Sequence, residues 1–284
     1  MTAVAEPFPS LAGVDARRWD ALAGAIDEIG PAVVAFSGGA DSALLAWASH
    51  HVLGAERTLV ATAVSASLPA TELDDCRRLA AEWGLDWTGV ETDELADPRY
   101  VANEADRCFW CKSALLDVLE PLAQARGATV VLGVNADDLG DHRPGQRAAD
   151  ERGARFPLLE AGLTKADVRA LSRSLGLRTA DKPAAACLAS RVPYGTAVTI
   201  GVLAEVEAAE RALRRLGFDV LRVRHHRDVA RLEVPLDRLA EVAERRAEVV
   251  AAVREAGFRY VALDLEGFRS GSLNRALGGS TSTM

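Results

Sequence analysis

Six consecutive residues, Ser37-Gly38-Gly39-Ala40-Asp41-Ser42, have the types needed to bind a phosphate group. They lie between an apolar run at residues 32–36 and a helical pattern at residues 43–53. Glycines let the backbone approach a ligand closely, and the amides at the start of a helix attract anions. The Asp41 carboxylate would repel phosphate, so it suits a Mg²⁺ ion that is bound to that phosphate. The segment therefore predicts a nucleotide site; the alternative is an ordinary tight turn in which Asp41 caps the helix.

A second polar segment, LGVNADDLGDHRPG at residues 132–145, follows another apolar run. In open α/β sheets, ligands bind beyond the carboxyl ends of the strands. We expect Gly133 and Asn135 to contribute to the nucleotide site, and Asp137 or Asp138 to share the Mg²⁺ with Asp41. Asp141 follows in the same segment. The alternative is a polar loop whose side chains serve as caps and turns.

The chain has four cysteines, Cys76, Cys108, Cys111 and Cys187. In a reducing compartment they are candidates for metal binding, sulfur chemistry or simple burial rather than for structural disulfides. The pair in Cys108-x-x-Cys111 also fits a zinc half-site, a redox pair or two residues at a helix start. Cys76 lies in the helical pattern at residues 70–83, where we expect it to be buried and inert.

Several arginines lie in the last third of the chain. Arg222 and Arg224 alternate on an expected strand, so their side chains should point to one face. Arg269 lies in a polar loop after the last expected strand. Guanidinium groups bind phosphate and carboxylate through paired hydrogen bonds, whereas surface salt bridges are the ordinary alternative. We expect His225 and His226 to be structural.

The elements that must position these residues alternate between strand and helix. Strands are predicted at residues 32–36, 58–65, 87–91 and 129–134, and helices at residues 14–29, 43–53, 70–83 and 111–126. The alternation predicts an α/β fold with a doubly wound parallel sheet. Beyond it, residues 135–163 and 179–198 read as irregular segments around a helix at 164–175.

The pattern changes after residue 199. A helix at residues 200–216, strands at 219–224 and 229–234, a helix at 236–256 and a strand at 259–264 form an αββαβ unit. We therefore predict a domain of residues 1–178 and a smaller α+β domain of residues 179–284.

The bulk composition excludes several classes of protein. The 284 residues carry a formal net charge of −8, whereas a general nucleic-acid binder is more often basic. No apolar run approaches the length of a membrane span, and the start of the chain does not read as a signal peptide. We therefore expect a cytoplasmic protein with a small-molecule substrate and neither nucleic acid nor membrane as partner.

The hexapeptide is similar to the SGGxDS signature of the pyrophosphatase-loop ATPases, and the GxxxxGK[ST] pattern of kinases and ordinary ATPases is absent. Further motifs resemble the LarE family of ATP-dependent sulfur transferases over residues 14–278. These motifs are RCFWCK (107–112), GVNADDLGDHRPG (133–145), ACLASRVPYG (186–195), LRVRHH (221–226), RLEVP (231–235) and LDLEGFRSGSLN (263–274). The resemblance implies an adenine nucleotide α-hydrolase-like fold, ATP and Mg²⁺.

The resemblance also implies a reaction. Such enzymes adenylate the carboxylates of pyridinium-3,5-biscarboxylic acid mononucleotide, release pyrophosphate and AMP, and leave thiocarboxylates for the nickel-pincer nucleotide cofactor. In one form, a single cysteine, which matches Cys187, gives up its own sulfur. In the other, three cysteines hold a [4Fe–4S] cluster that carries a sulfide, and Cys108, Cys111 and Cys187 fit that form better.

Further roles follow from the resemblance alone. The substrate-binding residues would be Ser190, Arg191, Glu210, Arg222, Arg224, Glu233 and Arg269. Arg191 could also help to lower the pKa of the Cys187 thiol. Members of the family are hexamers, and other enzymes act before and after them in cofactor synthesis.

Three other functions compete with this interpretation. An ammonia-using ATP pyrophosphatase, similar to NAD or GMP synthetase, would share the nucleotide loop and need no cysteine. A tRNA-thiolating enzyme is disfavoured by the acidic charge. A non-catalytic nucleotide sensor would bind ATP without releasing pyrophosphate.

Overall fold

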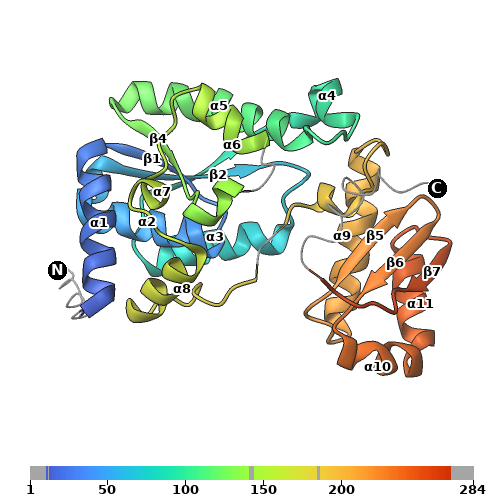
Figure 1. The fold of residues 1–284 in the computed structure, drawn as a ribbon. Coiled ribbons are helices and arrows are strands. Elements are labelled where there is room, and N and C mark those ends of the chain that lie inside the picture. The colour runs from blue at the N-terminus through green and yellow to red at the C-terminus, as the bar shows by residue number, and fades with distance from the viewer. Residues whose placement is uncertain (1–10, 12, 141–143, 184–185, 270–284) are drawn as a thin grey trace, which may run out of the picture. The chain divides into compact units, whose positions relative to one another are not determined.

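The computed structural model describes residues 11, 13–140, 144–183 and 186–269 (Figure 1). They form two compact units. Unit 1 takes the described residues of Met1–Val64, Ala70–Thr92 and Lys112–Ala185, and unit 2 those of Ser65–Pro69, Asp93–Cys111 and Ala186–Met284. Compactness thus divides the chain differently from the boundary at residues 178 and 179, which stays a prediction.

The sheet of unit 1 has four parallel strands in the order β3-β2-β1-β4. They are β1 (Ala32–Ala35), β2 (Thr58–Val64), β3 (Trp87–Glu91) and β4 (Thr129–Leu132). The two central strands read as continuous apolar runs because both faces of the sheet are covered. Val33 and Val34 point to opposite faces and belong to different core clusters.

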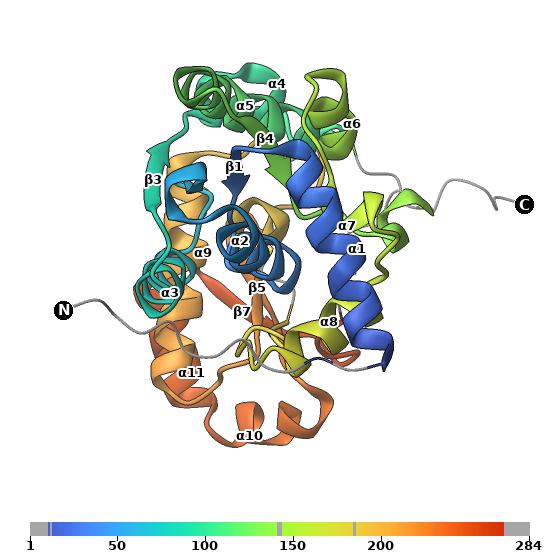
Figure 2. The same ribbon diagram turned by 90° about the vertical axis from the view of Figure 1, so that its left-hand side faces the viewer.

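Helices cover both faces of this sheet. Figure 2 shows α5 (Arg107–Arg126) and α6 (Pro144–Glu151) on one side, and α1 (Gly13–Ile29), α2 (Ala40–Leu53) and α8 (Lys165–Ser174) on the other. The short α7 (Pro157–Glu160) precedes α8, and α3 (Ala70–Glu82) packs into the same core cluster as α2. The predicted doubly wound α/β fold is confirmed.

The strand order creates a switch point beside β1. The chain moves from β1 to β2 and β3 in one direction and then returns to β4 on the other side of β1. The connections after β1 and β4 therefore leave the sheet at adjacent carboxyl ends, which is where ligands bind in folds of this kind.

Unit 2 contains a sheet of three strands in the order β5-β6-β7. Its strands are β5 (Arg222–His226), β6 (Val229–Glu233) and β7 (Tyr260–Leu263), and its helices are α4 (Pro98–Val101), α9 (Ile200–Arg215), α10 (Leu239–Glu244) and α11 (Arg246–Glu255). β5 and β6 are antiparallel, and β7 is parallel to β6. The core takes Leu203, Val223 and Val253 from the C-terminal part, and Tyr100 from far earlier in the chain.

Several sequence-based expectations are wrong. The segment 135–163, expected to be irregular, contains α6 and α7. The helix expected from residue 111 begins at Arg107, so it includes both cysteines of the C-x-x-C motif. The strand expected from residue 219 begins at Arg222. The helix expected over residues 236–256 is divided at Arg245, whose side chain donates a hydrogen bond to the Leu216 carbonyl.

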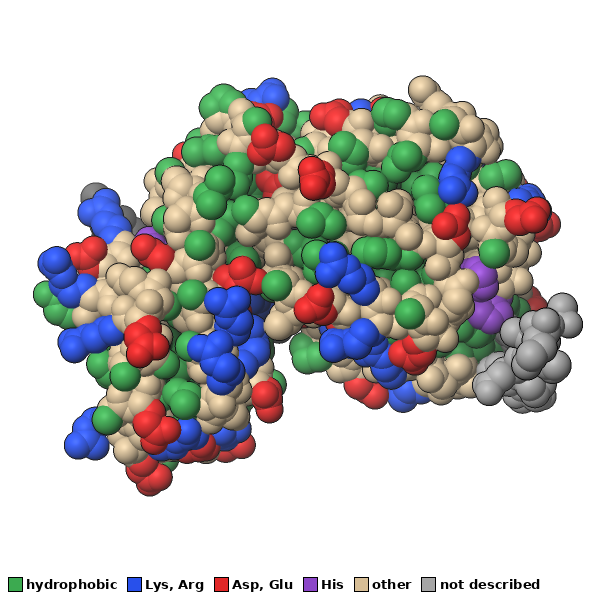
Figure 3. Space-filling model, turned by 180° about the vertical axis from the view of Figure 1, so that it is seen from behind, with side chains coloured by type: hydrophobic (Ala, Val, Ile, Leu, Met, Phe, Trp, Pro, Cys, Tyr) green, Lys and Arg blue, Asp and Glu red, His purple; other side chains and the backbone are tan. Residues whose placement is uncertain are grey.

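The surface carries mixed charge. On the face in Figure 3, Lys and Arg side chains are interspersed with Asp and Glu side chains. No helix in the described part of the chain is long and apolar enough to cross a membrane.

Candidate functional site

The Ser37–Ser42 turn joins β1 to α2 and is held by its own hydroxyl groups. The Ser42 hydroxyl lies 3.1 Å from the Ser37 hydroxyl, accepts the Ser37 amide at 3.2 Å and donates to the Gly39 carbonyl at 3.2 Å. No side chain caps the start of α2. Because the first amides of a helix lack carbonyl partners within it, this end can bind an anion.

Gly38 is the residue of the turn that must be a glycine. Its φ is +68°, and an added Cβ would lie 2.9 Å from the Cys76 sulfur. Burial raises the pKa of the Cys76 thiol to about 11. The predicted burial of Cys76 is confirmed, and its sulfur lies against Gly38 of the turn.

Gly133 brings the connection after β4 against the same turn. A Cβ on Gly133 would lie 2.8 Å from the Ser42 nitrogen and 2.9 Å from the Asp41 carbonyl carbon. Both neighbours are backbone atoms, which cannot move aside as a flexible side chain can. The two segments singled out in the sequence therefore meet at the switch point.

The Asp41 carboxylate has two partners in unit 1. The Asn135 side-chain amide donates to it at 3.3 Å, and the Lys165 ammonium at 2.5 Å. Asn135 is buried, whereas Lys165 is the first residue of α8. Lys165 is not among the site residues predicted from the sequence, because Asp41 lies far from it along the chain.

The other two aspartates are engaged with the backbone. Asp138 accepts the Asn135 amide at 3.0 Å, and Asp137 accepts the Lys165 amide at 2.9 Å. Among the described residues no three His, Cys, Asp or Glu side chains gather to hold a metal ion. The Asp41 carboxylate has hard oxygen ligands, which suit a Mg²⁺ ion that is bound to the phosphates of a nucleotide. Asp41, Asp137 and Asp138 do not together form a metal-binding group. Asp141 lies outside the described residues.

Lys182 is a second cation beside the turn, and it is not among the site residues predicted from the sequence. Its ammonium would lie 3.6 Å from a Cβ on Gly38, and it donates to Glu72 at 2.8 Å and to Asp75 at 2.7 Å. Burial alone would lower the pKa of Lys182, but these two carboxylates outweigh it and raise the pKa. Lys182 thus stays charged next to the expected phosphates.

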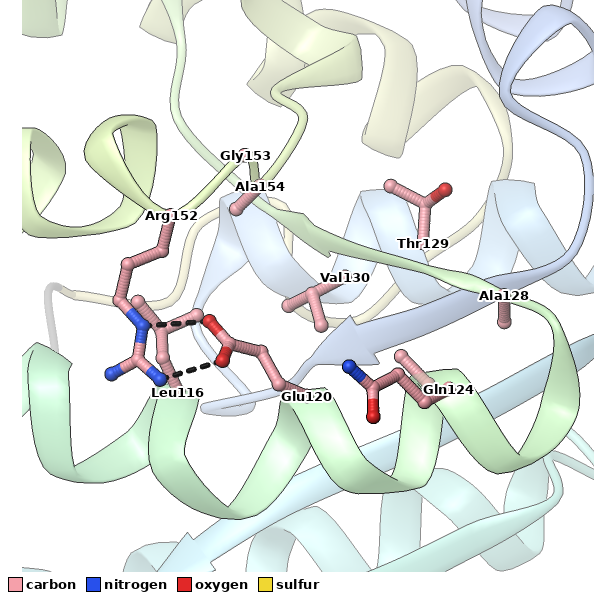
Figure 4. A pocket seen from close by; sticks show the side chains of 10 residues that line it. Leu116, Glu120, Gln124, Ala128, Thr129, Val130, Arg152, Gly153 and Ala154 are labelled. Carbon is pink, nitrogen blue, oxygen red and sulfur yellow. Dashed lines mark hydrogen bonds and ion pairs between the residues drawn. The ribbon is translucent and has the colours of Figure 1, made fainter.

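A hollow of about 460 Å³ in unit 1 lies elsewhere. Figure 4 shows it between α5 and the start of β4, with Thr129 and Val130 in its wall. Two hydrogen bonds of 2.6 Å join Arg152 to Glu120 across one side. Since it lies where β4 begins, whereas Gly133 follows the end of that strand, it is separate from the nucleotide turn.

In unit 2, Cys187 begins a short turn that Arg191 braces. The Arg191 guanidinium donates to the carbonyls of Ala186 at 2.6 Å and Cys187 at 3.0 Å, and the Ser190 hydroxyl donates to the Cys187 carbonyl at 2.7 Å. These bonds fix the backbone of the cysteine rather than its thiol. Cys187 itself is half-buried.

Two buried glutamates hold the arginines. Glu210 binds the guanidinium of Arg191 at 2.8 and 3.0 Å, and Glu233 binds that of Arg224 at 2.9 and 2.8 Å. Burial alone would raise the pKa of Glu210, but the charge and hydrogen bonds of Arg191 outweigh it and lower the pKa. Both glutamates are almost fully buried, so their direct geometric role is to orient arginines.

Arg222 differs from its neighbours. Burial, together with the positive charge of Arg191, lowers the pKa of Arg222 to about 10. Its guanidinium lies 5.3 Å from the ring centre of Phe268, the residue before Arg269. Arg269 pairs with Glu266. Because these surroundings disfavour the charge on Arg222, an incoming anion would be stabilised there.

The remaining cysteines lie on the first turn of α5. Cys108 is exposed and Cys111 half-buried, and a spacing of three places them on one side of the helix. Arg107, the residue before Cys108, donates to the Ala189 carbonyl at 2.9 Å, two residues after Cys187. Cys111 and Cys187 both pack against the core cluster of unit 2.

Comparisons with known proteins show which proteins this chain is similar to. No family model matches the chain. It is 46% identical to an uncharacterised protein of Synechocystis over 88% of this chain and 94% of that one. It is 40% identical to the pyridinium-3,5-bisthiocarboxylic acid mononucleotide synthase of Lactiplantibacillus plantarum, over 90% of this chain and 93% of that one.

A shorter match concerns the nucleotide-binding superfamily. Over 66 residues, 23% of this chain and 25% of the relative, the sequence is 45% identical to the NH(3)-dependent NAD(+) synthetase of Methanococcoides burtonii. The glycine-lined turn at the switch point agrees with that relationship. Given the turn in unit 1, the three cysteines of unit 2 and the match along nearly the whole length of the synthase, the chain belongs to the LarE family, that of the pyridinium-3,5-bisthiocarboxylic acid mononucleotide synthases.

Proposed function

We propose that this protein uses ATP to convert the carboxylates of pyridinium-3,5-biscarboxylic acid mononucleotide into thiocarboxylates for the nickel-pincer nucleotide cofactor, with release of pyrophosphate and AMP. The observation that carries the proposal is the 40% identity to the named synthase over 90% of the chain. The geometry of the Ser37–Ser42 turn and the cysteines of unit 2 support it independently.

The first step is adenylation. A carboxylate oxygen of the substrate attacks the α-phosphorus of ATP, and the bond from that phosphorus to the pyrophosphate oxygen breaks. The amides at the start of α2 and the hydroxyls of Ser37 and Ser42 bind the departing pyrophosphate, whose charge grows as the bond breaks. Lys182 adds positive charge beside Gly38. Mg²⁺ held near Asp41 would neutralise phosphate charge.

The second step puts sulfur on the activated carbon. A sulfur nucleophile attacks the acyl carbon, and AMP leaves with the oxygen that it had activated. If Cys187 supplies the sulfur, a thioester forms; removal of the Cys187 Hα then expels the thiocarboxylate from Cβ and leaves dehydroalanine. This sequence balances without any oxidant or reductant.

A [4Fe–4S] cluster on Cys108, Cys111 and Cys187 is the other source of sulfur that we consider. The packing of Cys111 and Cys187 against one core cluster and the hydrogen bond from Arg107 to the Ala189 carbonyl support it, whereas the described residues do not form a ready-made metal-binding group. When bound, such a cluster would supply the sulfide that replaces the Cys187 sulfur.

Unit 2 also carries the proposed substrate site. Arg222, Arg224 and Arg269 would bind the phosphate or carboxylate groups of the substrate, and Arg222 is the member whose surroundings most favour an added anion. Ser190 and Arg191 would hold the Cys187 turn, while Glu210 and Glu233 would orient Arg191 and Arg224.

Half-reactions test the proposal. Wild-type protein with ATP, Mg²⁺ and the biscarboxylate nucleotide should release pyrophosphate and AMP and give a product with sulfur in place of oxygen, read by mass spectrometry. Cys187→Ala should retain substrate-dependent exchange of labelled pyrophosphate into ATP and form no sulfur product. Asp41→Asn should lose both. Full turnover of ATP to AMP and pyrophosphate by Cys187→Ala, with ammonia as the acceptor, would instead favour the ammonia-using alternative.

Anaerobic purification separates the two sulfur sources. A brown protein with iron bound in proportion to the chain supports the cluster. A colourless active protein that loses the mass of one H₂S per chain, in a single turnover, supports sacrifice of Cys187. Light scattering of the same preparation measures the oligomeric state, for which the hexamer of the family is the expectation.

A further inference from the structure

Asn103 is a buried residue in an unusual conformation. It is 0% exposed, and its φ of +56° lies in the left-handed region. Its side-chain amide donates to three backbone carbonyls of another segment, those of Val192 at 3.3 Å, Pro193 at 2.8 Å and Thr196 at 2.9 Å. A left-handed backbone that is not a glycine costs free energy and is kept only where surrounding contacts require it.

Arg107 completes the link. Its Nη1 donates to the Asn103 Oδ1 at 2.6 Å and to the Ala189 carbonyl at 2.9 Å. The side chain is 4% exposed, and its guanidinium lies 5.7 Å from the ring centre of Tyr194. Arg107 therefore joins the start of α5 to the segment that follows Cys187.

Backbone bonds run alongside these side chains. The Gly195 amide donates to the Asn103 carbonyl at 3.0 Å, and the Val198 amide to the Val101 carbonyl at 2.9 Å. Hydrogen bonds thus join residues 101–107 to residues 189–198 within unit 2. Cys108 directly follows the first of these segments, and Cys187 directly precedes the turn that leads into the second.

We infer that Asn103 and Arg107 are positioning residues that hold the Cys187 turn beside Cys108 and Cys111. The inference rests on the proposed function, in which these thiols act together. Side chains that only filled the core would be apolar, whereas Asn103 directs both donor hydrogens to carbonyls and its acceptor to Arg107, which fixes one register between the two segments.

A bridging reagent tests the arrangement without any substrate. Dibromobimane becomes strongly fluorescent when both of its arms have alkylated thiols that lie close together. We would use cluster-free protein carrying Cys111→Ser, so that Cys108 and Cys187 form the pair. Peptide mapping would confirm the bridge, and Cys76 should stay unmodified because it is buried.

Asn103→Gly keeps the left-handed backbone and removes every side-chain bond, and Arg107→Lys keeps the charge and removes the fixed geometry. Each should slow bridging at least about tenfold, since small displacements of reacting groups cost that much or more. Alkylation of the separate thiols by a monofunctional reagent should change by less than about twofold. Arg259→Lys, at an exposed position of unit 2, is the matched control and should bridge at the wild-type rate.

Unchanged bridging in both variants would overturn the inference. So would loss of the folded circular dichroism spectrum in both, because Asn103 and Arg107 would then support the fold rather than the placement of the thiols. Neither outcome depends on ATP or on the nucleotide substrate, so failure of this inference is distinguishable from failure of the proposed function.

Discussion

Gly133 ends its strand without a side chain, and backbone atoms of Asp41 and Ser42 occupy the space that a Cβ would need. We predict that Gly133→Ala displaces the start of α2 and lowers kcat/KM for ATP at least about tenfold, equivalent to about 1.4 kcal/mol. Exchange of labelled pyrophosphate into ATP measures the change.

The matched control is Gly24→Ala. Gly24 lies inside α1, and a Cβ there would meet no atom within 4 Å. Alanine should therefore leave ATP kinetics unchanged and stabilise the helix by about 0.5–1 kcal/mol. Equal activity of the two alanine variants would contradict the role assigned to Gly133.

Residue types alone predicted much of the nucleotide turn. Gly38 was predicted as a turn residue, and its positive φ is one that glycine adopts readily. Asp41 was predicted as a cation ligand because a carboxylate beside a phosphate needs a cation between them. Lys165 and Lys182 were missed because a lysine carries no local signal of its partner. Their roles depend on Asp41, Glu72 and Asp75, which lie far from them in the sequence.

The element α2 carries a pH dependence in its last turn. Burial lowers the pKa of both His50 and His51 below the ordinary value of about 6.5. At pH values between the lowered pKa of the folded state and about 6.5, these histidines bind more protons in the unfolded chain than in the folded protein. The free energy of unfolding therefore falls as the pH drops below about 6.5. Above that range the two states bind equal numbers of protons at these residues.

We therefore predict that wild-type protein loses more stability between pH 7 and pH 5 than a variant with both histidines replaced by glutamine. Urea unfolding followed by tryptophan fluorescence at the two pH values gives the difference. An equal loss in the two proteins would mean that other groups govern this range.

Glu210 connects three elements of unit 2. It lies on α9, binds Arg191 of the Cys187 turn and accepts the Val223 amide of β5 at 3.1 Å. Glu210→Leu should cost about 3–5 kcal/mol of unfolding free energy, because it leaves the Arg191 charge buried without its partner. Adding Arg191→Met should recover part of that loss.

The control for this prediction is an exposed pair in the same unit. Glu241 of α10 binds Arg238 at 2.7 Å and Arg245 at 3.2 Å at the surface. Glu241→Leu should lower the unfolding free energy far less than Glu210→Leu, because water screens this surface pair. Denaturant unfolding compares the three variants, and a similar cost at both glutamates would reject the distinction.

Element boundaries were predictable where an apolar run was continuous. β1 and β2 begin where predicted and end one residue earlier, whereas α5 begins four residues before its predicted start. In the first turn of α5, Trp110 donates to Asp106 and stacks beneath Arg99, with the guanidinium carbon 3.5 Å from its ring centre. These contacts come from the residues around the turn, so the spacing of apolar residues could not place the helix start at Arg107.

At the scale of the whole molecule, the chain enters unit 2 twice before its C-terminal part. The segment 93–111 supplies Tyr100, which is 1% exposed, and Asn103 to that unit. Hydrophobic runs along the sequence favoured a contiguous division because they cannot reveal which later segment an early one joins.

We predict that residues 179–284 expressed alone do not fold cooperatively, because they lack Tyr100 and the Asn103 side chain that donates to the carbonyls of Val192, Pro193 and Thr196. When residues 93–111 are added as a separate peptide, the folded fraction of the 179–284 fragment should rise with the fraction that has bound the peptide. Circular dichroism during thermal unfolding measures both. A sharp transition in the isolated fragment would support the contiguous boundary at residues 178 and 179 instead.

The left-handed backbone at Asn103 also limits how this sequence can evolve. Glycine, the other residue that adopts such a backbone readily, is not reached from an asparagine codon by a single base change. Aspartate is reached in that way, but it would set a carboxylate against the carbonyls of Val192, Pro193 and Thr196. The two substitutions that would strain the backbone least, glycine and aspartate, are therefore disfavoured at this position. Related proteins that keep the cysteine pair should also keep the asparagine.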